Sequence, residues 1–111
     1  MAEANLQSHD EAQEIEMFEG VSRRTLNHGD QTSIHEIVIA KGGVVPEHTH
    51  PHEQTGYLVS GRLRFVMPGL EKELEPGDSW IVPGEMPHEV TALADSVAID
   101  IFSPARTEYI P

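Results

Sequence analysis

The sequence predicts a single all-β domain, a sandwich or barrel built from short strands. Its 111 residues match the common size of one domain, which can bury one core but not two. β-Branched and aromatic residues gather in short runs, and Gly- or Pro-containing turn sequences separate these runs. No stretch repeats apolar residues with the period of a helix, and no internal repeat is present.

The first part of the chain divides into an arm and two strands. Residues 1–13 are polar and acidic, which predicts a flexible N-terminal arm ahead of a domain over residues 14–111. In EIEMFEG, Ile15 and Met17 alternate with acidic residues, and in TSIHEIVIA β-branched residues dominate. Both patterns favour strands over helices. Turn signals lie on either side of the second strand, NHGD before TSIHEIVIA and KGG after it.

The rest of the chain predicts six further strands, separated by SG, PGLE, EPGD, VPGEMP and ADS. Their expected ranges are 54–60, 62–67, 72–75, 79–82, 88–93 and 97–102. The residues expected to adopt positive φ are Gly42, Gly61, Gly69 and Gly77. The residues expected to fill the barrel are Leu58, Leu63, Phe65, Trp80 and Val82.

Composition excludes several classes of function. Without cysteine the chain has no disulfide, no thiolate nucleophile and no zinc–thiolate site. A formal charge of −12 with only seven Lys and Arg argues against nucleic acid and anionic membrane surfaces as partners. No apolar run approaches the roughly 18 residues of a membrane span, and no signal peptide is evident, so we expect a cytoplasmic protein.

Candidate metal ligands concentrate in GGVVPEHTHPHEQTGYLVSGRL, residues 42–63. His48 and His50 are two residues apart, so on an extended backbone their imidazoles project from the same face. Gln54 begins the next predicted strand and offers an amide oxygen. Imidazole nitrogens and amide oxygens suit first-row divalent metals. The other histidines are expected outside the cluster: His52 beside it, and His9, His28 and His35 on the surface or the sheet exterior.

The C-terminal strand, VAIDIFSPARTEYIP, leaves two arrangements open. Asp100 and Phe102 share one face, and Val97, Ile99 and Ile101 share the other. If Asp100 faces the barrel interior, the three aliphatic side chains face outward and require cover from a partner subunit or the N-terminal segment. A homodimer is then expected. If the aliphatic residues form the core, Asp100 is an ordinary solvated residue.

The spacing of these residues resembles the two motifs of the cupin superfamily. The first, G-x5-H-x-H-x3-E-x6-G, is matched by Gly42, His48, His50 and Gly61, with Gln54 where Glu is usual. The second, G-x5-P-x-G-x2-H-x3-N, is matched by Gly77, Pro83 and His88, with Glu85 and Ala92 at the departures. The resemblance implies a jelly-roll β-barrel that holds one divalent transition metal (Ni, Zn, Mn, Fe or Co) through His48, His50, Gln54 and His88.

Three longer segments narrow the resemblance: HTHPHEQTGYLVSGRLRF, EPGDSWIVPGEMPHEV and IDIFSPARTEY. They are similar to the small pectin-degradation cupins of the KdgF type, which act on 4,5-unsaturated monouronates released by pectate and alginate lyases. The resemblance implies an isomerase-like enzyme that linearises a small anionic sugar acid. It also implies pocket residues: Asp100 to move a proton, Arg106 to bind the uronate carboxylate, and Phe102 as an apolar wall.

Two other functions fit the sequence: a metal-dependent dioxygenase acting on a small organic acid or enol, and a non-catalytic cupin that binds a small molecule. Iron oxygenases usually present two His and one carboxylate, so the amide of Gln54 weakens the dioxygenase interpretation. Glu53 is the nearest carboxylate, but it lies one residue short of the motif spacing and is expected to face away from the metal. The sequence names neither the metal nor the preferred uronate.

Overall fold

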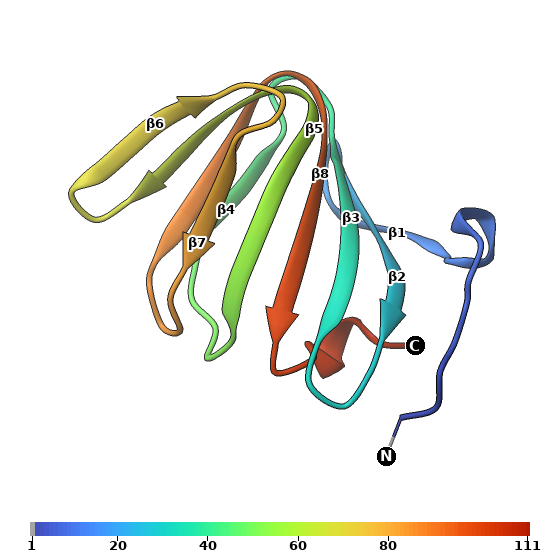
Figure 1. Cartoon of the computed structure of the whole chain (residues 1–111). Coiled ribbons are helices and arrows are strands. Elements are labelled where there is room, and N and C mark those ends of the chain that lie inside the picture. Colours follow the sequence, from blue (N-terminus) through green and yellow to red (C-terminus); the bar gives the residue numbers. More distant parts are fainter. Residues whose placement is uncertain (1) are drawn as a thin grey trace.

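The computed structural model describes residues 2–111 and is made almost entirely of β-strands (Figure 1). The strands, in chain order, are β1 (Glu14–Phe18), β2 (Val21–His28), β3 (Ser33–Ile39), β4 (Val44–His48), β5 (Glu53–Met67), β6 (Leu70–Leu74), β7 (Ser79–Val82) and β8 (His88–Ser103). Short 3-10 turns, η1 (His9–Glu11) and η2 (Thr107–Tyr109), lie near the two ends. The predicted all-β fold is confirmed.

Two long strands organise the barrel. The sheet order is β1-β2-β3-β8-β5-β6, with β4 paired to β8 and β7 paired to β5, all antiparallel. The first half of β8 pairs with β4 and its second half with β3. The first half of β5 likewise pairs with β7 and its second half with β6. Each long strand therefore takes part in both halves of the folded sheet, which closes around one interior.

The sequence predicted a break in each long strand, and both breaks are wrong. The Ser-Gly of residues 60–61 and the Ala-Asp-Ser of residues 94–96 lie within β5 and β8, where the strand register shifts but the pairing continues. Gly61 has a φ of 94°, and a Cβ on it would lie 2.2 Å from the Ser96 hydroxyl oxygen. These turn-like sequences bend the strands instead of ending them.

Strand β2 was not predicted, because its inward-facing positions do not look apolar. Val21, Arg23 and Thr25 alternate along the strand, and Val21 and Thr25 are buried. All four glycines expected to have positive φ do so: Gly42, Gly61, Gly69 and Gly77.

The core fills one end of the barrel with apolar side chains. It includes all five predicted residues, Leu58, Leu63, Phe65, Trp80 and Val82, together with Val21, Ile37, Ile39, Leu74, Val90, Ala92 and Ala98. Complete burial of a side chain such as Leu58 stabilises the fold by roughly 1.5–3 kcal/mol. Several of the buried polar residues lie together, and the candidate site is built from four of them: His50, Gln54, His88 and Asp100.

The N-terminal arm runs along the outside of the barrel (Figure 1). It contacts β2 and its neighbourhood through the backbone amide of Ala2, which donates to Asp30, and through Asn5 and Asn27. His9 reaches Glu36 on β3. The flexibility predicted for residues 1–13 stays a prediction.

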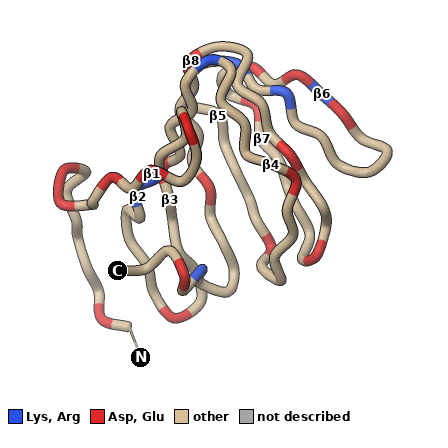
Figure 2. The backbone as a smooth tube through the Cα atoms, turned by 180° about the vertical axis from the view of Figure 1, so that it is seen from behind, with Lys and Arg blue, Asp and Glu red and all other residues tan. Residues whose placement is uncertain are grey.

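Charge is distributed without a basic cluster. Figure 2 shows acidic residues along the whole backbone and only scattered Lys and Arg. Within residues 2–111, no helix has the length and apolar character needed to cross a membrane.

Candidate functional site

Three histidines from separate parts of the chain meet inside the barrel. His48 ends β4, His50 lies in the loop that follows, and His88 begins β8. Pairing of β4 with β8 places His48 opposite His88, with ring centroids 4.1 Å apart. One ligand nitrogen from each residue lies within 4.8 Å of the other two. The structure thus brings together the three histidines that the sequence singled out.

Backbone carbonyls fix which nitrogen of each ring faces the centre. Each Nδ1 lies at hydrogen-bond distance from a carbonyl oxygen: 2.8 Å from His48 to Pro46, 3.0 Å from His50 to His52, and 2.8 Å from His88 to Met86. Because a carbonyl oxygen only accepts, each Nδ1 carries the hydrogen, and each neutral ring keeps an Nε2 lone pair. Three lone pairs are therefore available for one ion.

Burial favours the neutral form of two of these rings, His50 and His88. It lowers the pKa of His50, and it lowers the pKa of His88 to about 4. Nε2 of His88 is buried and has no hydrogen-bond partner among residues 2–111. A buried polar atom without a partner destabilises the fold. The Nε2 lone pair of a neutral imidazole can bind a metal cation, which would remove this cost.

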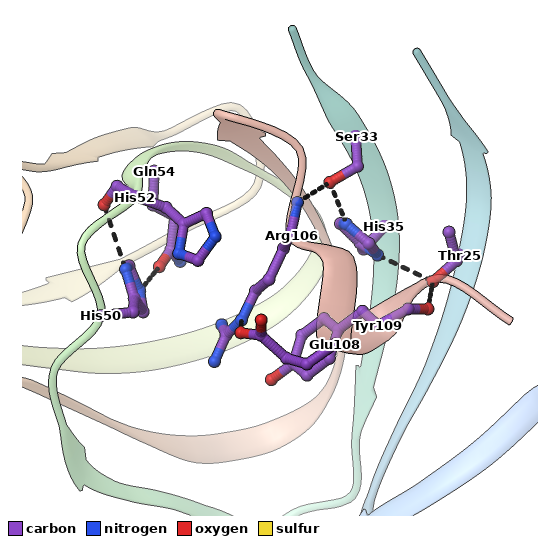
Figure 3. Close-up of polar contacts among 9 residues, drawn as sticks. All are labelled: Thr25, Ser33, His35, His50, His52, Gln54, Arg106, Glu108 and Tyr109. Atoms are coloured by element: carbon purple, nitrogen blue, oxygen red, sulfur yellow. Dashed lines mark hydrogen bonds and ion pairs between the residues drawn. The ribbon is translucent and has the colours of Figure 1, made fainter. Parts of the chain in front are cut away.

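Gln54 presents its amide oxygen to the same centre. Its Nε2 donates to Oδ1 of Asp100 at 2.9 Å, which turns its Oε1 toward Nε2 of His50, 3.0 Å away (Figure 3 shows Gln54 and His50). With Nδ1 of His50 protonated, two lone pairs face each other across this distance. A metal ion that both lone pairs bind removes their repulsion, so the donor set of His48, His50, His88 and Gln54 fits a first-row divalent metal.

Asp100 and Phe102 face the interior, so the arrangement with Val97, Ile99 and Ile101 as core is wrong. Asp100 is 9% exposed and Phe102 2%. Oδ1 of Asp100 accepts hydrogen bonds from Gln54 and from Nε1 of Trp80, at 2.9 and 3.0 Å. Burial raises the pKa of Asp100 to about 6, although both hydrogen bonds oppose the rise.

Trp80 was expected to fill the barrel, with a place in the pocket wall as the alternative. In the structure it does the first and also contacts a site residue, Asp100. Its indole occupies space left by Gly56, because a Cβ on Gly56 would lie 2.0 Å from Nε1 of Trp80. The pairing of β5 with β7 places these two residues opposite each other. The sequence alone does not show that Gly56 and Trp80 lie opposite each other, because this depends on the register of the two strands.

Arg106 lies beyond β8, beside Phe102. Its guanidinium carbon is 4.8 Å from the ring centroid of Phe102 and 4.0 Å from that of Tyr109, and its Nε donates to Glu108 at 2.7 Å. The side chain is 11% exposed. Figure 3 shows it extending from the C-terminal segment toward the side of the site where His50 and Gln54 lie.

A cavity of about 40 Å³ lies among these side chains. Its lining is Met17, Ile37, Val45, His48, Gln54, His88, Asp100, Phe102, Arg106 and Tyr109. It has room for an ion and a few water-sized groups. A larger surface hollow of about 610 Å³ includes Glu14, Glu16 and Asp95 in its lining and no histidine, so it carries none of this chemistry.

One histidine lies elsewhere than expected, and another lies beside the site as expected. His35, assigned to the exterior, is completely buried and packs edge-on against Phe102 and Tyr109. Strand alternation contains the signal, since His35 shares a face with Ile37 and Ile39, both core residues. His52 is buried beside the site. Glu53 is exposed and points away, as expected, and His9 and His28 lie on the surface.

Known proteins share this fold. Residues 35–102 match the cupin domain. The pectin degradation protein KdgF of Dickeya dadantii (strain 3937) is 30% identical over 103 residues, which is 91% of this chain and 94% of that protein.

Two solved structures superpose closely. KdgF from a Halomonas species has a TM-score of 0.90 at 30% identity, covering 96% of this chain and 100% of that one. An RmlC-like cupin from Shewanella frigidimarina NCIMB 400 has a TM-score of 0.90 at 27% identity, covering 97% of each chain. The protein therefore belongs to the cupin family and resembles the pectin-degradation proteins of the KdgF type within it.

Proposed function

We propose that this protein is a metal-dependent enzyme that opens the ring of 4,5-unsaturated monouronates from pectin or alginate breakdown and promotes their ketonisation. One observation carries the proposal: three of the four neutral donors, His48, His88 and Gln54, line one cavity together with a carboxyl group and a guanidinium. The fourth donor, His50, lies beside them. The similarity to two KdgF proteins supports the substrate class.

The metal would be held by Nε2 of His48, His50 and His88 and by Oε1 of Gln54. Such an ion, whether Ni, Zn, Mn, Fe or Co, supplies Lewis acidity that polarises substrate oxygens when it is bound. All four donors are uncharged, so they leave the charge of the ion undiminished. Asp100 holds the amide of Gln54 in the orientation that this requires.

Asp100 would move the proton. The hydroxyl at C1 of the cyclic hemiacetal loses its proton to the carboxylate, the bond between C1 and the ring oxygen breaks, and C1 becomes an aldehyde. The electron pair stays on the former ring oxygen as an enolate across C4 and C5. Asp100 returns the proton to C4, which leaves a ketone at C5, so the reaction is a net isomerisation without a co-reactant.

The hydrogen bonds of Asp100 suit this role. Both of its donors, Gln54 and Trp80, bind Oδ1. Oδ2 therefore remains available to exchange a proton with a substrate in the cavity that Asp100 lines.

Arg106 and Phe102 would orient the substrate. A guanidinium binds a carboxylate through two parallel hydrogen bonds, and the bond of Arg106 to Glu108 uses Nε and neither Nη atom. Phe102 forms the apolar wall against which the ring lies. A six-carbon acid exceeds the volume of the cavity, so its carboxylate end is expected at the cavity mouth.

Ultraviolet absorbance tests the proposal, because the conjugated double bond of the unsaturated uronate absorbs and the ketone does not. The metal-loaded protein should accelerate the decay of absorbance. Asp100→Asn should lower kcat by about 10²- to 10⁴-fold, and Arg106→Ala should raise KM. Glu53→Gln, which removes an exposed carboxylate, is the matched control and should leave both constants unchanged. Decay at the spontaneous rate would overturn the assignment.

We also propose that the protein is a homodimer. The outward face of β3, β5, β7 and β8 carries exposed apolar side chains: Val38, Tyr57, Val59, Ile81 and Ile101. Tyr57 and Ile81 are 50% and 51% exposed, and large apolar side chains exposed on neighbouring strands are typical of a surface that meets a partner. Light scattering after gel filtration should give twice the chain mass, and Ile81→Asp should give the chain mass. A monomeric wild type contradicts the proposal.

A further inference from the structure

A chain of hydrogen bonds, buried at its centre and partly buried at its ends, connects β2 and β3 to both ends of the C-terminal turn (Figure 3). The backbone amide of Arg106 donates to the hydroxyl of Ser33 at 2.9 Å, and that hydroxyl lies 2.7 Å from Nε2 of His35. On the other side of the ring, Nδ1 of His35 lies 3.0 Å from the hydroxyl of Thr25, which donates to the carbonyl of Tyr109 at 2.6 Å.

The directions of these bonds follow from chemistry. A carbonyl oxygen only accepts, so the hydroxyl of Thr25 donates its hydrogen to the carbonyl of Tyr109. The same hydroxyl oxygen must then accept from Nδ1–H of His35. Nε2 of His35 then has no hydrogen and accepts the hydrogen of Ser33. The oxygen of Ser33 accepts from Arg106. Every group in the chain is satisfied when His35 is neutral with its hydrogen on Nδ1.

The surroundings favour the neutral ring. Arg106, Arg23 and His28 are cationic or basic groups near His35, and Glu108 is the acidic one. Burial, followed by Arg106 and Arg23, lowers the pKa of His35 to about 4. The chain of hydrogen bonds is therefore intact at neutral pH.

Few other bonds hold this segment. Within residues 2–111, the hydrogen bonds that join residues 104–111 to the barrel are the two at the ends of the chain just described. The remaining hydrogen bonds of the segment are internal, including that of Arg106 with Glu108. Packing adds to these bonds: Ala105 is buried, and the ring centroid of Tyr109 lies 4.1 and 4.0 Å from the guanidinium carbons of Arg23 and Arg106.

We infer that His35 is a positioning residue, and that the Ser33–His35–Thr25 chain holds Arg106 at the cavity so that it can bind the substrate carboxylate. The expected effect on the affinity for substrate rests on the proposed function. The expected anchoring of residues 104–111 does not, because it follows from the hydrogen bonds alone.

Trypsin tests the structural part without substrate. Cleavage after Arg106 releases residues 107–111, and mass spectrometry quantifies this peptide. Thr25→Val and Ser33→Ala each remove one hydroxyl, so each should increase its rate of release about tenfold or more. Thr25→Ser keeps the hydroxyl and should restore the wild-type rate. Thr91→Val makes the same change on β8, where the hydroxyl has no hydrogen bond within residues 2–111, and should have no effect.

Cleavage after Arg64 distinguishes release of the segment from unfolding, because Arg64 is paired on both sides within the sheet. It should stay slow in every variant. Nitrogen NMR of the wild type should show His35 as the neutral tautomer with hydrogen on Nδ1. The opposite tautomer, or release of residues 107–111 at the wild-type rate from both Thr25→Val and Ser33→Ala, overturns the inference.

Kinetics test whether the chain acts through Arg106. Thr25→Val should raise KM about tenfold with little change in kcat, since it weakens binding and not the chemical step. In a double-mutant cycle, Thr25→Val should add no further loss to Arg106→Ala. Additive losses overturn the inference. If the wild type shows no activity, the proposed function fails while the trypsin and NMR results still decide the structural part.

Discussion

At the scale of single residues, the site depends on which atom of each side chain is already occupied. Carbonyl groups bind the Nδ1 hydrogens of three histidines, and Asp100 binds the amide hydrogen of Gln54. What remains is a set of lone pairs directed at one point. The preference for a cation arises from these outer hydrogen bonds as much as from the residue types.

Metal binding should stabilise the folded protein. With free metal at 100 times the dissociation constant, the gain is about 2.7 kcal/mol. We expect the melting temperature to rise on addition of nickel or zinc and to return to its starting value after chelation. His88→Gln should lose the increase, and His28→Gln, a change at an exposed histidine, should keep it. An equal increase in both variants would place the metal elsewhere.

Trp80 offers a second test at the residue scale. Trp80→Phe keeps an aromatic ring but removes the hydrogen bond from Nε1 to Asp100. A hydrogen bond to a charged group contributes about 1.5–3 kcal/mol, so kcat should fall by about 10- to 100-fold. Circular dichroism should remain that of the wild type. Unchanged kcat would show that Gln54 alone positions the carboxylate.

At the scale of elements, β5 and β8 carry the fold because each bends without ending. The bend in β5 centres on Gly61, which faces Ser96 of β8 at close distance. The hydroxyl of Ser96 accepts the amide hydrogen of Arg62 at 3.0 Å and so replaces a bond lost from the irregular ladder. A side chain at position 61 would separate the two strands where they support both halves of the barrel.

Alanine substitution at two glycines separates crowding from backbone strain. Gly61→Ala should destabilise the protein by about 3 kcal/mol, because it combines a positive φ with a clash against Ser96. Gly69→Ala has a positive φ but nothing within 4 Å of the added Cβ, so about 1 kcal/mol is expected. Urea unfolding measures both. Similar losses would mean that the neighbourhood of Gly61 yields to accommodate the methyl group.

At the scale of the whole molecule, buried titratable residues make the stability of the fold depend on pH. His35 has an ordinary pKa of 6.5 and a folded pKa of about 4, so between these values the unfolded chain binds more protons. Its contribution to stability is complete above pH 6.5 and is lost as the pH falls toward 4. The buried His88 acts in the same direction, and Asp100, whose pKa is raised, acts in the opposite one.

The variant His35→Gln isolates the contribution of His35 to the pH dependence of the free energy of unfolding. The free energy of unfolding of the wild type should fall by up to about 1.4 kcal/mol per pH unit, relative to His35→Gln, between pH 6.5 and 4. The contributions of His88 and Asp100 are common to both proteins and cancel in the difference. Urea titrations at several pH values measure it. Parallel curves for the two proteins would show that His35 keeps its ordinary pKa in the fold.

The sequence by itself determined the all-β class, the positive φ of four glycines and the group of residues 48, 50, 54 and 88. These features depend on local backbone preference and on fixed spacing along the chain, which a single sequence records. The sequence left open which face of the sheet Asp100 points to. It also predicted His35 on the exterior and a break in each of β5 and β8. These points depend on strand register and on which face packs inward, and pairing between distant segments decides them. Only the tertiary structure therefore revealed the contact of Trp80 with Asp100 and the hydrogen-bond chain through His35.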